Sequence, residues 1–138
     1  MSDRMRIVGF CCSHGAYSSA DLAGVMRISY SPSVMIIRVP CAGRIDVLHI
    51  LRAFRDGADA VFVAGCLEGN CHFEYGNFEA RKMVEHAKRL LSDIGIEAER
   101  VEMFNVASNQ AWRFPEIVGE MVSRVDKLGL SPLKKVIK

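Results

Sequence analysis

Short apolar runs alternate with amphipathic stretches along most of this chain of 138 residues. Runs rich in β-branched and aromatic residues predict strands over about residues 6–11, 34–39, 60–64 and 99–106. Apolar side chains at helical spacing predict helices over about residues 45–54, 77–94 and 115–128, and a short helix capped near Ser18. This alternation predicts an α/β fold: a single doubly wound, mainly parallel sheet of about four strands with flanking helices, of the flavodoxin-like or Rossmann-like kind.

The second strand-like run, residues 34–39, is nearly uninterrupted in apolar residues. Such runs are typical of parallel strands that helices cover on both faces. We therefore expect this strand to be buried on both faces, and we expect the same of the first strand. Because neighbours in a strand point to opposite faces, Cys11 and Cys12 are not expected to serve one metal centre equally.

Length and composition narrow the class of protein. The chain fits one domain over residues 1–138, which needs no disulfides, and the basic residues 131–138 are expected to form a mobile tail. Half of the residues are hydrophobic and the net charge is only +2, which is typical of a soluble globular protein and argues against nucleic-acid binding. The first residues do not resemble a signal peptide, and no apolar stretch approaches the roughly 20 residues of a membrane helix. We expect a cytoplasmic protein with no membrane partner.

Four of the five cysteines stand where a strand-like run stops, and the fifth follows closely; they are Cys11, Cys12, Cys41, Cys66 and Cys71. The carboxyl ends of neighbouring parallel strands share one edge of the sheet, where open α/β sheets bind their ligands. In a reducing compartment, such cysteines are more often metal-binding, catalytic or buried than disulfide-bonded. The pattern predicts a site for a metal or for redox chemistry at this edge.

Thiolates bind both iron and zinc, and a 2Fe–2S cluster usually takes four of them. Four residues separate Cys66 from Cys71, a spacing that also occurs in plant-type ferredoxin loops. The ligands are spread along the chain, unlike the paired Cys-x-x-Cys knuckles of structural zinc sites, and this favours a cluster over zinc. Buried or redox-active thiols remain the alternative to a metal site, because free cysteine is among the most buried residue types.

Residues next to the thiols suit an anionic cluster. Gly43 and Gly69 would allow backbone N–H groups to approach sulfur closely, and Arg44 could compensate negative charge. The helix after Cys41 would direct the positive end of its dipole toward the same site. These residues are candidates for the surroundings of the cluster rather than for ligands.

Other motifs near the strand ends support competing functions less well. Cys12 and His14 could pair a thiol with a base, but the Cys-x-x-Cys motif of thioredoxins is missing. His14 and His72 could each replace a thiolate ligand, as histidines do in Rieske centres. The turn after the first strand lacks the Gly-x-Gly-x-x-Gly spacing of a dinucleotide site. Trp112 and Phe114 are expected in the core rather than in a partner-binding patch.

Several separated motifs together carry a family resemblance. They are FCC at residues 10–12, ADLAG at 20–24, IRVPCAGRID at 37–46, GADAVFVAGC at 57–66, GNCH at 69–72 and GN at 76–77. These motifs resemble the delta subunit of methyl-viologen-reducing hydrogenase over roughly residues 7–114. The resemblance implies a 2Fe–2S cluster with Cys41, Cys66 and Cys71 as ligands, and with Cys11 or Cys12 completing the set.

The resemblance also implies a function. Such a protein passes electrons between an oxidoreductase, of the hydrogenase or formate dehydrogenase type, and the flavin-containing A subunit of heterodisulfide reductase in an anaerobic complex. This chain departs from the family pattern at Gly15, where relatives commonly carry another cysteine, and at Leu67 and Glu68, where they carry a proline-containing loop. The departure leaves open a specialised branch or an altered or absent cluster. The alternatives are a clusterless scaffold or adaptor in such a complex, and a thiol-based redox enzyme or sensor.

Overall fold

The sheet is parallel throughout. The computed structural model describes residues 5–12, 33–39, 45–65, 76–106, 110 and 112–133, with the backbone alone at 76–78. Along these residues the elements are β1 (Ile7–Cys12), β2 (Val34–Val39), α2 (Val47–Arg55), β3 (Ala60–Gly65), α3 (Gly76–Asp93), the short 3₁₀ helix η2 (Ala98–Arg100), β4 (Val101–Asn105) and α4 (Arg113–Leu128). The strand order is β2-β1-β3-β4. The predicted α/β fold is confirmed, and the helix expected near Ser18 lies outside the described residues.

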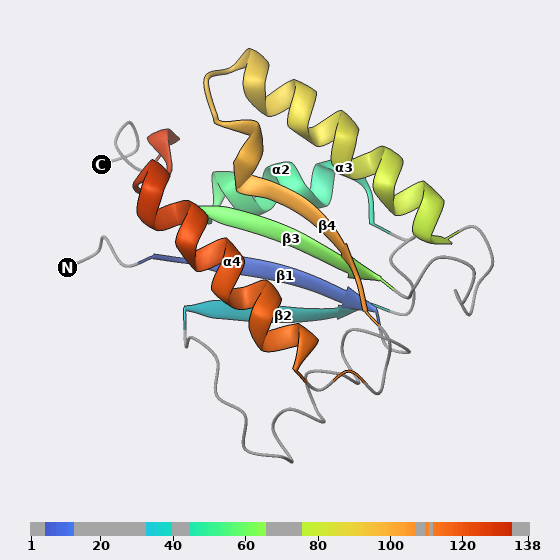
Figure 1. The fold of residues 1–138 in the computed structure, drawn as a ribbon. Coiled ribbons are helices and arrows are strands. Elements are labelled where there is room, and N and C mark those ends of the chain that lie inside the picture. The colour runs from blue at the N-terminus through green and yellow to red at the C-terminus, as the bar shows by residue number, and fades with distance from the viewer. Residues whose placement is uncertain are drawn as a thin grey trace.

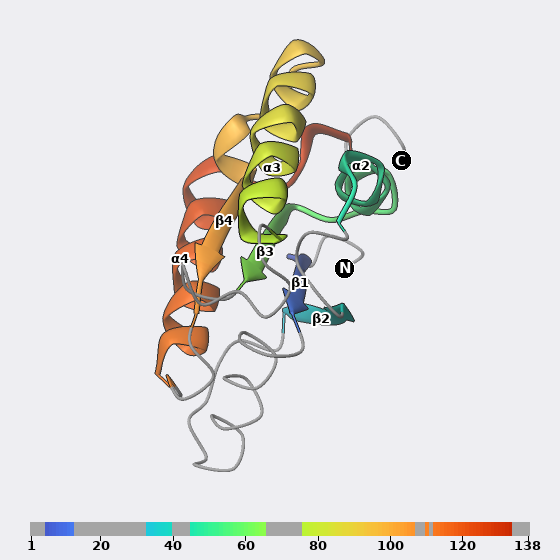
Figure 2. The ribbon, with the colours of Figure 1, turned by 90° about the vertical axis from the view of Figure 1, so that its right-hand side faces the viewer.

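Helices cover the sheet from both sides, as the two views in Figures 1 and 2 show. The helices α2 and α3 pack on one face, where their apolar side chains meet Val61 and Val63 of β3. The helix α4 packs on the other face, where it meets Ala60, Phe62 and Ala64. The alternation of a strand thus divides the apolar residues of β3 between two cores. Within the described residues, no helix combines the length and the apolar character that a bilayer span requires.

The core under α4 is built around Phe62. Its ring makes edge-on contacts with Phe104 of β4 and Phe114 of α4, with 6.2 Å between ring centroids in both pairs. Gly9 of β1 pairs with Phe62 in the register, and a Cβ atom at Gly9 would overlap the Phe62 ring. The large ring therefore requires a residue without a side chain on the neighbouring strand.

The strand β2 differs from its predicted environment. It is an edge strand, and the exposed fractions of Met35 and Ile37 are 63% and 39%. The expectation that both of its faces are buried is wrong. A continuous apolar run is typical of a parallel strand, but it does not reveal whether the strand lies at the centre or at the edge of the sheet.

At the amino edge of the sheet, where the parallel strands begin, one buried carboxylate holds two distant segments of the chain together. Asp59 immediately precedes β3 and is fully buried. Its Oδ2 accepts the backbone N–H of Arg6 at 2.8 Å, and its Oδ1 accepts the backbone N–H of Ser131 at 2.7 Å. One side chain therefore holds the segment before β1 against the segment after α4, which lies 72 residues away from Asp59 along the chain.

Arg100 completes this fastening from the 3₁₀ helix η2. Its side chain is 1% exposed, and its Nη1 donates to the backbone carbonyl of Asp59 at 3.0 Å. Its Nη2 donates to the carbonyls of Leu128 and Leu130 at 3.4 and 3.3 Å, and its Nε pairs with Glu97 at 2.7 Å. A buried guanidinium is tolerated because most of its donors are satisfied. Arg100 thus gives the end of α4 a fixed place beside the start of β3.

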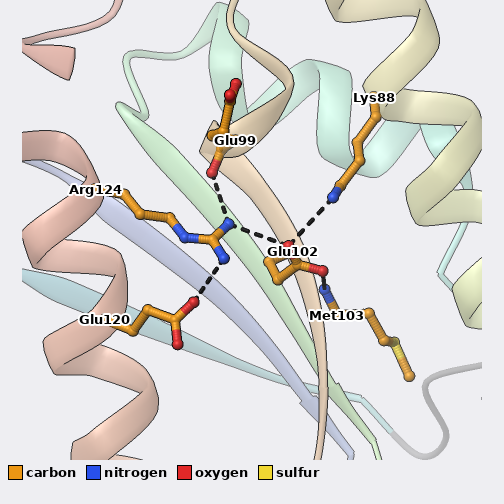
Figure 3. A network of polar contacts seen from close by, with 6 residues as sticks. All are labelled: Lys88, Glu99, Glu102, Met103, Glu120 and Arg124. Carbon is orange, nitrogen blue, oxygen red and sulfur yellow. Dashed lines mark hydrogen bonds and ion pairs between the residues drawn. The ribbon is translucent and has the colours of Figure 1, made fainter. Parts of the chain in front are cut away.

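The edge strand β4, which lies at the other end of the strand order from β2, is covered by charged side chains (Figure 3). Glu102 of β4 accepts from Lys88 of α3 at 3.2 Å and from Arg124 of α4 at 3.1 Å. Arg124 also donates to Glu120 at 2.6 Å and to the carbonyl of Glu99 at 2.9 Å. These contacts join the helices of the two faces across the outer side of β4. Charged side chains of this kind protect an edge strand from pairing with another strand.

The fastening by Asp59 predicts a large loss of stability when its carboxylate is removed. Asp59→Ala would remove the acceptor of two backbone N–H groups, that of Ser131, whose bond is buried, and that of Arg6, whose bond is partly buried. We expect the free energy of unfolding, measured by urea denaturation, to fall by about 3 kcal/mol. The exposed Asp126 of α4 supplies the control, because Asp126→Ala should change it by less than about 0.5 kcal/mol. Equal effects of the two substitutions would contradict this role of Asp59.

The network around Glu102 predicts a dependence of stability on pH. Burial tends to raise the pKa of this carboxyl, but the charge and hydrogen bond of Lys88, with the bonds from Met103 and Arg124, outweigh burial and lower the pKa from 4.5. Because the folded pKa lies below the unfolded one, the stabilisation is present above the unfolded pKa and is lost as the pH falls through the folded pKa.

We therefore expect Glu102→Gln to reduce the free energy of unfolding by about 1 kcal/mol at pH 7. The difference from the wild type should shrink as the pH falls through the region below about 4.5. Urea denaturation at a series of pH values measures this difference. Glu85→Gln on the exposed side of α3 is the matched control. A difference that stays constant with pH would contradict the electrostatic origin.

Candidate metal centre

The register of the sheet places the ends of three strands in one row. Cys12, the last residue of β1, pairs with Val39, the last residue of β2. Cys11 pairs with Ala64, so that the end of β3 at Gly65 lies one residue further, level with Cys12. Neighbouring parallel strands lie about 4.8 Å apart. The carboxyl edge therefore brings these three strand ends close together, as Figure 1 shows by the arrowheads of β1, β2 and β3.

Cys11 is a core residue. Its side chain is fully buried in the apolar cluster under α4 that contains Phe62, Phe104 and Phe114. Its Sγ is 3.9 Å from the carbonyl oxygen of Gly9, a weak hydrogen bond in which the thiol donates. Burial, with a smaller contribution from Cys12, raises the pKa of the Cys11 thiol to about 12. This environment favours the neutral thiol over the thiolate that a metal needs.

Cys12 occupies a different place. It is 2% exposed and, as the next residue along the strand, it lies on the sheet face opposite to Cys11. It is also the residue of β1 closest to the carboxyl edge. The sequence correctly predicted that both faces of β1 are covered, since five of its six residues are buried. The sequence did not distinguish the two thiols, and the structure assigns them to different surroundings.

The other predicted site residues lie outside the described residues. They are Cys41, Cys66, Cys71, Gly43, Arg44 and Gly69, together with the alternative ligands His14 and His72. In the chain, Cys41 follows the end of β2 by two residues, and Cys66 directly follows the end of β3. Among the side chains that the structure does describe, no three of His, Cys, Asp or Glu converge as metal ligands.

The helix α2 begins on the side of the cysteine edge, because it returns from the end of β2 to the start of β3. Its first turn is held by His49, whose Nδ1 accepts the backbone N–H of Asp46 at 2.9 Å. The positive end of the helix dipole therefore faces the carboxyl edge. The sequence alone does not reveal this role of His49, because it depends on the conformation of the helix start.

Trp112 and Phe114 were both expected in the core. Phe114 is fully buried, as predicted, whereas Trp112 is 66% exposed just before α4. The reason is the helix start: one residue of α4 separates the two side chains, so they leave the helix in different directions. Since α4 follows β4, Trp112 adds an exposed aromatic side chain on the cysteine side of the sheet. The sequence contains no signal that separates these two aromatic residues.

Known proteins similar to this chain include iron-sulfur proteins of hydrogenases. The family model of the methyl-viologen-reducing hydrogenase, delta subunit, matches residues 7–129. The vhu iron-sulfur protein of the F420-non-reducing hydrogenase of Methanocaldococcus jannaschii, its D subunit, is 46% identical over 128 residues, which cover 93% of this chain and 96% of the relative. The protein of the same name from Methanococcus maripaludis is 49% identical over the same number of residues and with the same coverage.

A second kind of relative is much longer than this chain. The A subunit of the Ferredoxin/F(420)H(2)-dependent CoB-CoM heterodisulfide reductase of Methanosarcina acetivorans is 34% identical over 123 residues. The match covers 89% of this chain but only 16% of that relative. The fold, the row of strand ends and these similarities lead to one conclusion: the chain belongs to the methyl-viologen-reducing hydrogenase delta-subunit family.

Proposed function

We propose that this chain is an electron-transfer protein of a larger complex and carries a 2Fe–2S cluster at the carboxyl edge of its sheet. The row formed by Cys12, Val39 and Gly65 carries the proposal, because the chain continues from this row directly into the other cysteines. The two hydrogenase relatives are named as iron-sulfur proteins, which supports it. A bound cluster of this type would supply one-electron transfer, and the chain would supply its ligands and surroundings.

The ligands of this proposal are Cys12, Cys41, Cys66 and Cys71. Connectivity supports the choice of Cys41 and Cys66, since one residue of chain spans about 3.8 Å between Cα atoms and both follow the row of strand ends within two residues. Cys71 is within reach of the same place through the short segment that follows Cys66. Cys12 is preferred to Cys11, because Cys11 lies in the apolar core under α4 with its thiol bonded to Gly9.

The surroundings proposed for the cluster are cationic and rich in backbone donors. Gly43 and Gly69 flank the proposed ligands in sequence and offer N–H groups that a side chain would not obstruct. Arg44 would compensate the negative charge of a thiolate-bound cluster, and the N-terminus of α2 faces the same edge. These features would raise the reduction potential relative to a bare cluster.

The partners follow from the two kinds of relative. We propose that the chain passes electrons between an oxidoreductase of the hydrogenase or formate dehydrogenase type and a flavin-containing A subunit like that of heterodisulfide reductase. The A-subunit relative supports the second partner, because a segment similar to this chain forms part of that longer protein. The proposed location of such a complex is the cytoplasm.

Spectroscopy of protein purified without oxygen tests the proposal. We expect two iron and two acid-labile sulfide per chain, visible absorption, and a paramagnetic signal of a 2Fe–2S cluster after reduction with dithionite. A protein without iron and sulfide would overturn the proposal and leave a clusterless adaptor or a thiol-based sensor. Zinc in place of iron, or four irons per chain, would overturn the cluster type.

Single substitutions of the two neighbouring cysteines test the ligand choice. Cys12→Ser should lower the iron and sulfide content and remove the paramagnetic signal, whereas Cys11→Ala should leave both unchanged at the cost of about 1 kcal/mol of stability. Cys66→Ser and Cys71→Ser serve as controls that should behave like Cys12→Ser. Loss of the cluster in Cys11→Ala but not in Cys12→Ser would contradict the assignment.

A further inference from the structure

A groove of about 1030 Å³ runs between α2 and the edge strand β2. Val8 and Phe10 of β1 form its floor. Met35 and Ile37 of β2 line one side, and α2 lines the other side with Ala53 among its residues. The register pairs Val8 with Met35 and Phe10 with Ile37, so that the floor and the β2 side belong to one face of the sheet. The apolar core that covers β3 on this face therefore continues outward as an open apolar surface.

The two edge strands of the sheet, β4 and β2, differ in how much apolar surface they expose. At β4, Lys88, Glu102 and Arg124 close the edge with ion pairs. At β2, Met35 is 63% exposed and Ile37 is 39% exposed. Exposed apolar residues at the edge of a sheet, bordered by charge, are typical of a surface that another protein covers.

The charges on the border of the groove are mostly positive. Arg6 lies at one end and Arg52 on the α2 side, and neither forms an ion pair with another residue of the described ranges. Asp56 also lines the groove, but it pairs with Arg55 at 3.1 Å. A partner that buries the apolar floor would therefore be favoured if it carried acidic residues beside its own apolar residues.

Residues near both ends of the described chain lie close to this groove. The carboxylate of Asp59 holds the backbone N–H groups of Arg6 and Ser131 together, and Arg6 lines the groove. In the A-subunit relative, a segment similar to 89% of this chain is continuous with a much longer protein. In that relative, a segment similar to this chain and the rest of an A subunit are therefore held together in one protein.

We propose that the groove between α2 and β2 binds an apolar segment of a heterodisulfide-reductase-type A subunit that carries acidic residues on its flanks. The inference rests on the proposed function, which supplies this partner, and it adds the surface and the chemistry of the contact. The groove extends from Arg6 at the amino edge to Phe10, Ile37 and His49 toward the cysteine edge. A segment lying along it would hold the partner beside the side of the sheet where the cluster is proposed.

Binding measurements on the full chain, isolated with its cofactor and titrated with the purified A subunit of the same organism, test the inference. Met35→Asp places a charge on the apolar side of the groove, and Arg52→Glu reverses the charge of its border. We expect each substitution to weaken binding and to raise the dissociation constant about tenfold or more. Binding of the wild type should also weaken with increasing salt, and Arg52→Glu should reduce that dependence.

Matched controls exist for both variants. The exposed fraction of Ile94 is 66%, which is similar to that of Met35, but Ile94 does not line the groove. Ile94→Asp should therefore change the dissociation constant less than twofold. Arg89 of α3 is exposed and does not line the groove, so Arg89→Glu should behave like Ile94→Asp. The four substituted residues are exposed, so circular dichroism should show an unchanged fold for each variant.

The possible failures are distinguishable. Wild-type protein that does not bind this partner at all would overturn the partner in the proposed function. Wild-type binding that Met35→Asp and Arg52→Glu leave unchanged would overturn the groove while leaving that partner in place. Sedimentation that shows a dimer of the chain alone, dissociated by Met35→Asp, would assign the groove to a second copy and would also overturn the inference.

Discussion

The carboxylate of Asp59 is the interaction on which the arrangement of the chain depends most. Its two oxygens accept backbone N–H groups from the segment before β1 and from the segment after α4. Burying a carboxylate is costly, and the cost is offset only when its oxygens are hydrogen-bonded. Arg100 adds bonds to the Asp59 carbonyl and to the carbonyls after α4. The amino edge is therefore held by directed polar bonds, which fix the relative positions of segments far apart in sequence.

The hydrogen bonds of Asp59 lie at the amino edge of the sheet, and the proposed cluster site lies at the carboxyl edge. The strands β1, β2 and β3 end in one row, which is separate from the bonds at the amino edge. Phe62 fills the space under α4 and leaves Cys11 inside the core, whereas Cys12 lies at the limit of the sheet. The proposed cluster and the proposed groove then adjoin the same sheet. A rigid support is what an electron-transfer site needs, because the cluster must keep its distance from the cofactors of both partners.

Much of the fold was predictable because it depends on local patterns. The strand-like runs and the helical spacing correctly predicted the four strands, the three α-helices of the described ranges and the parallel sheet, but not the 3₁₀ helix η2. Phe114 was correctly placed in the core. The exposure of Met35 was not predictable, since the strand order decides which strand lies at the edge. Trp112 was placed wrongly for a similar reason, because the direction of the helix start decides which aromatic side chain enters the core.

The sequence by itself determined the fold class, the position of the cysteines at strand ends, and the family to which the chain is similar. These follow from periodicity, spacing and short motifs, which act over a few residues. Only the tertiary structure decided the different surroundings of Cys11 and Cys12, the closed edge at β4 and the open groove at β2. Each of these depends on which side chains from distant segments meet. The order of the strands and the packing of α4 on Phe62 and Phe104 decide which of these contacts form, and no local sequence pattern encodes them.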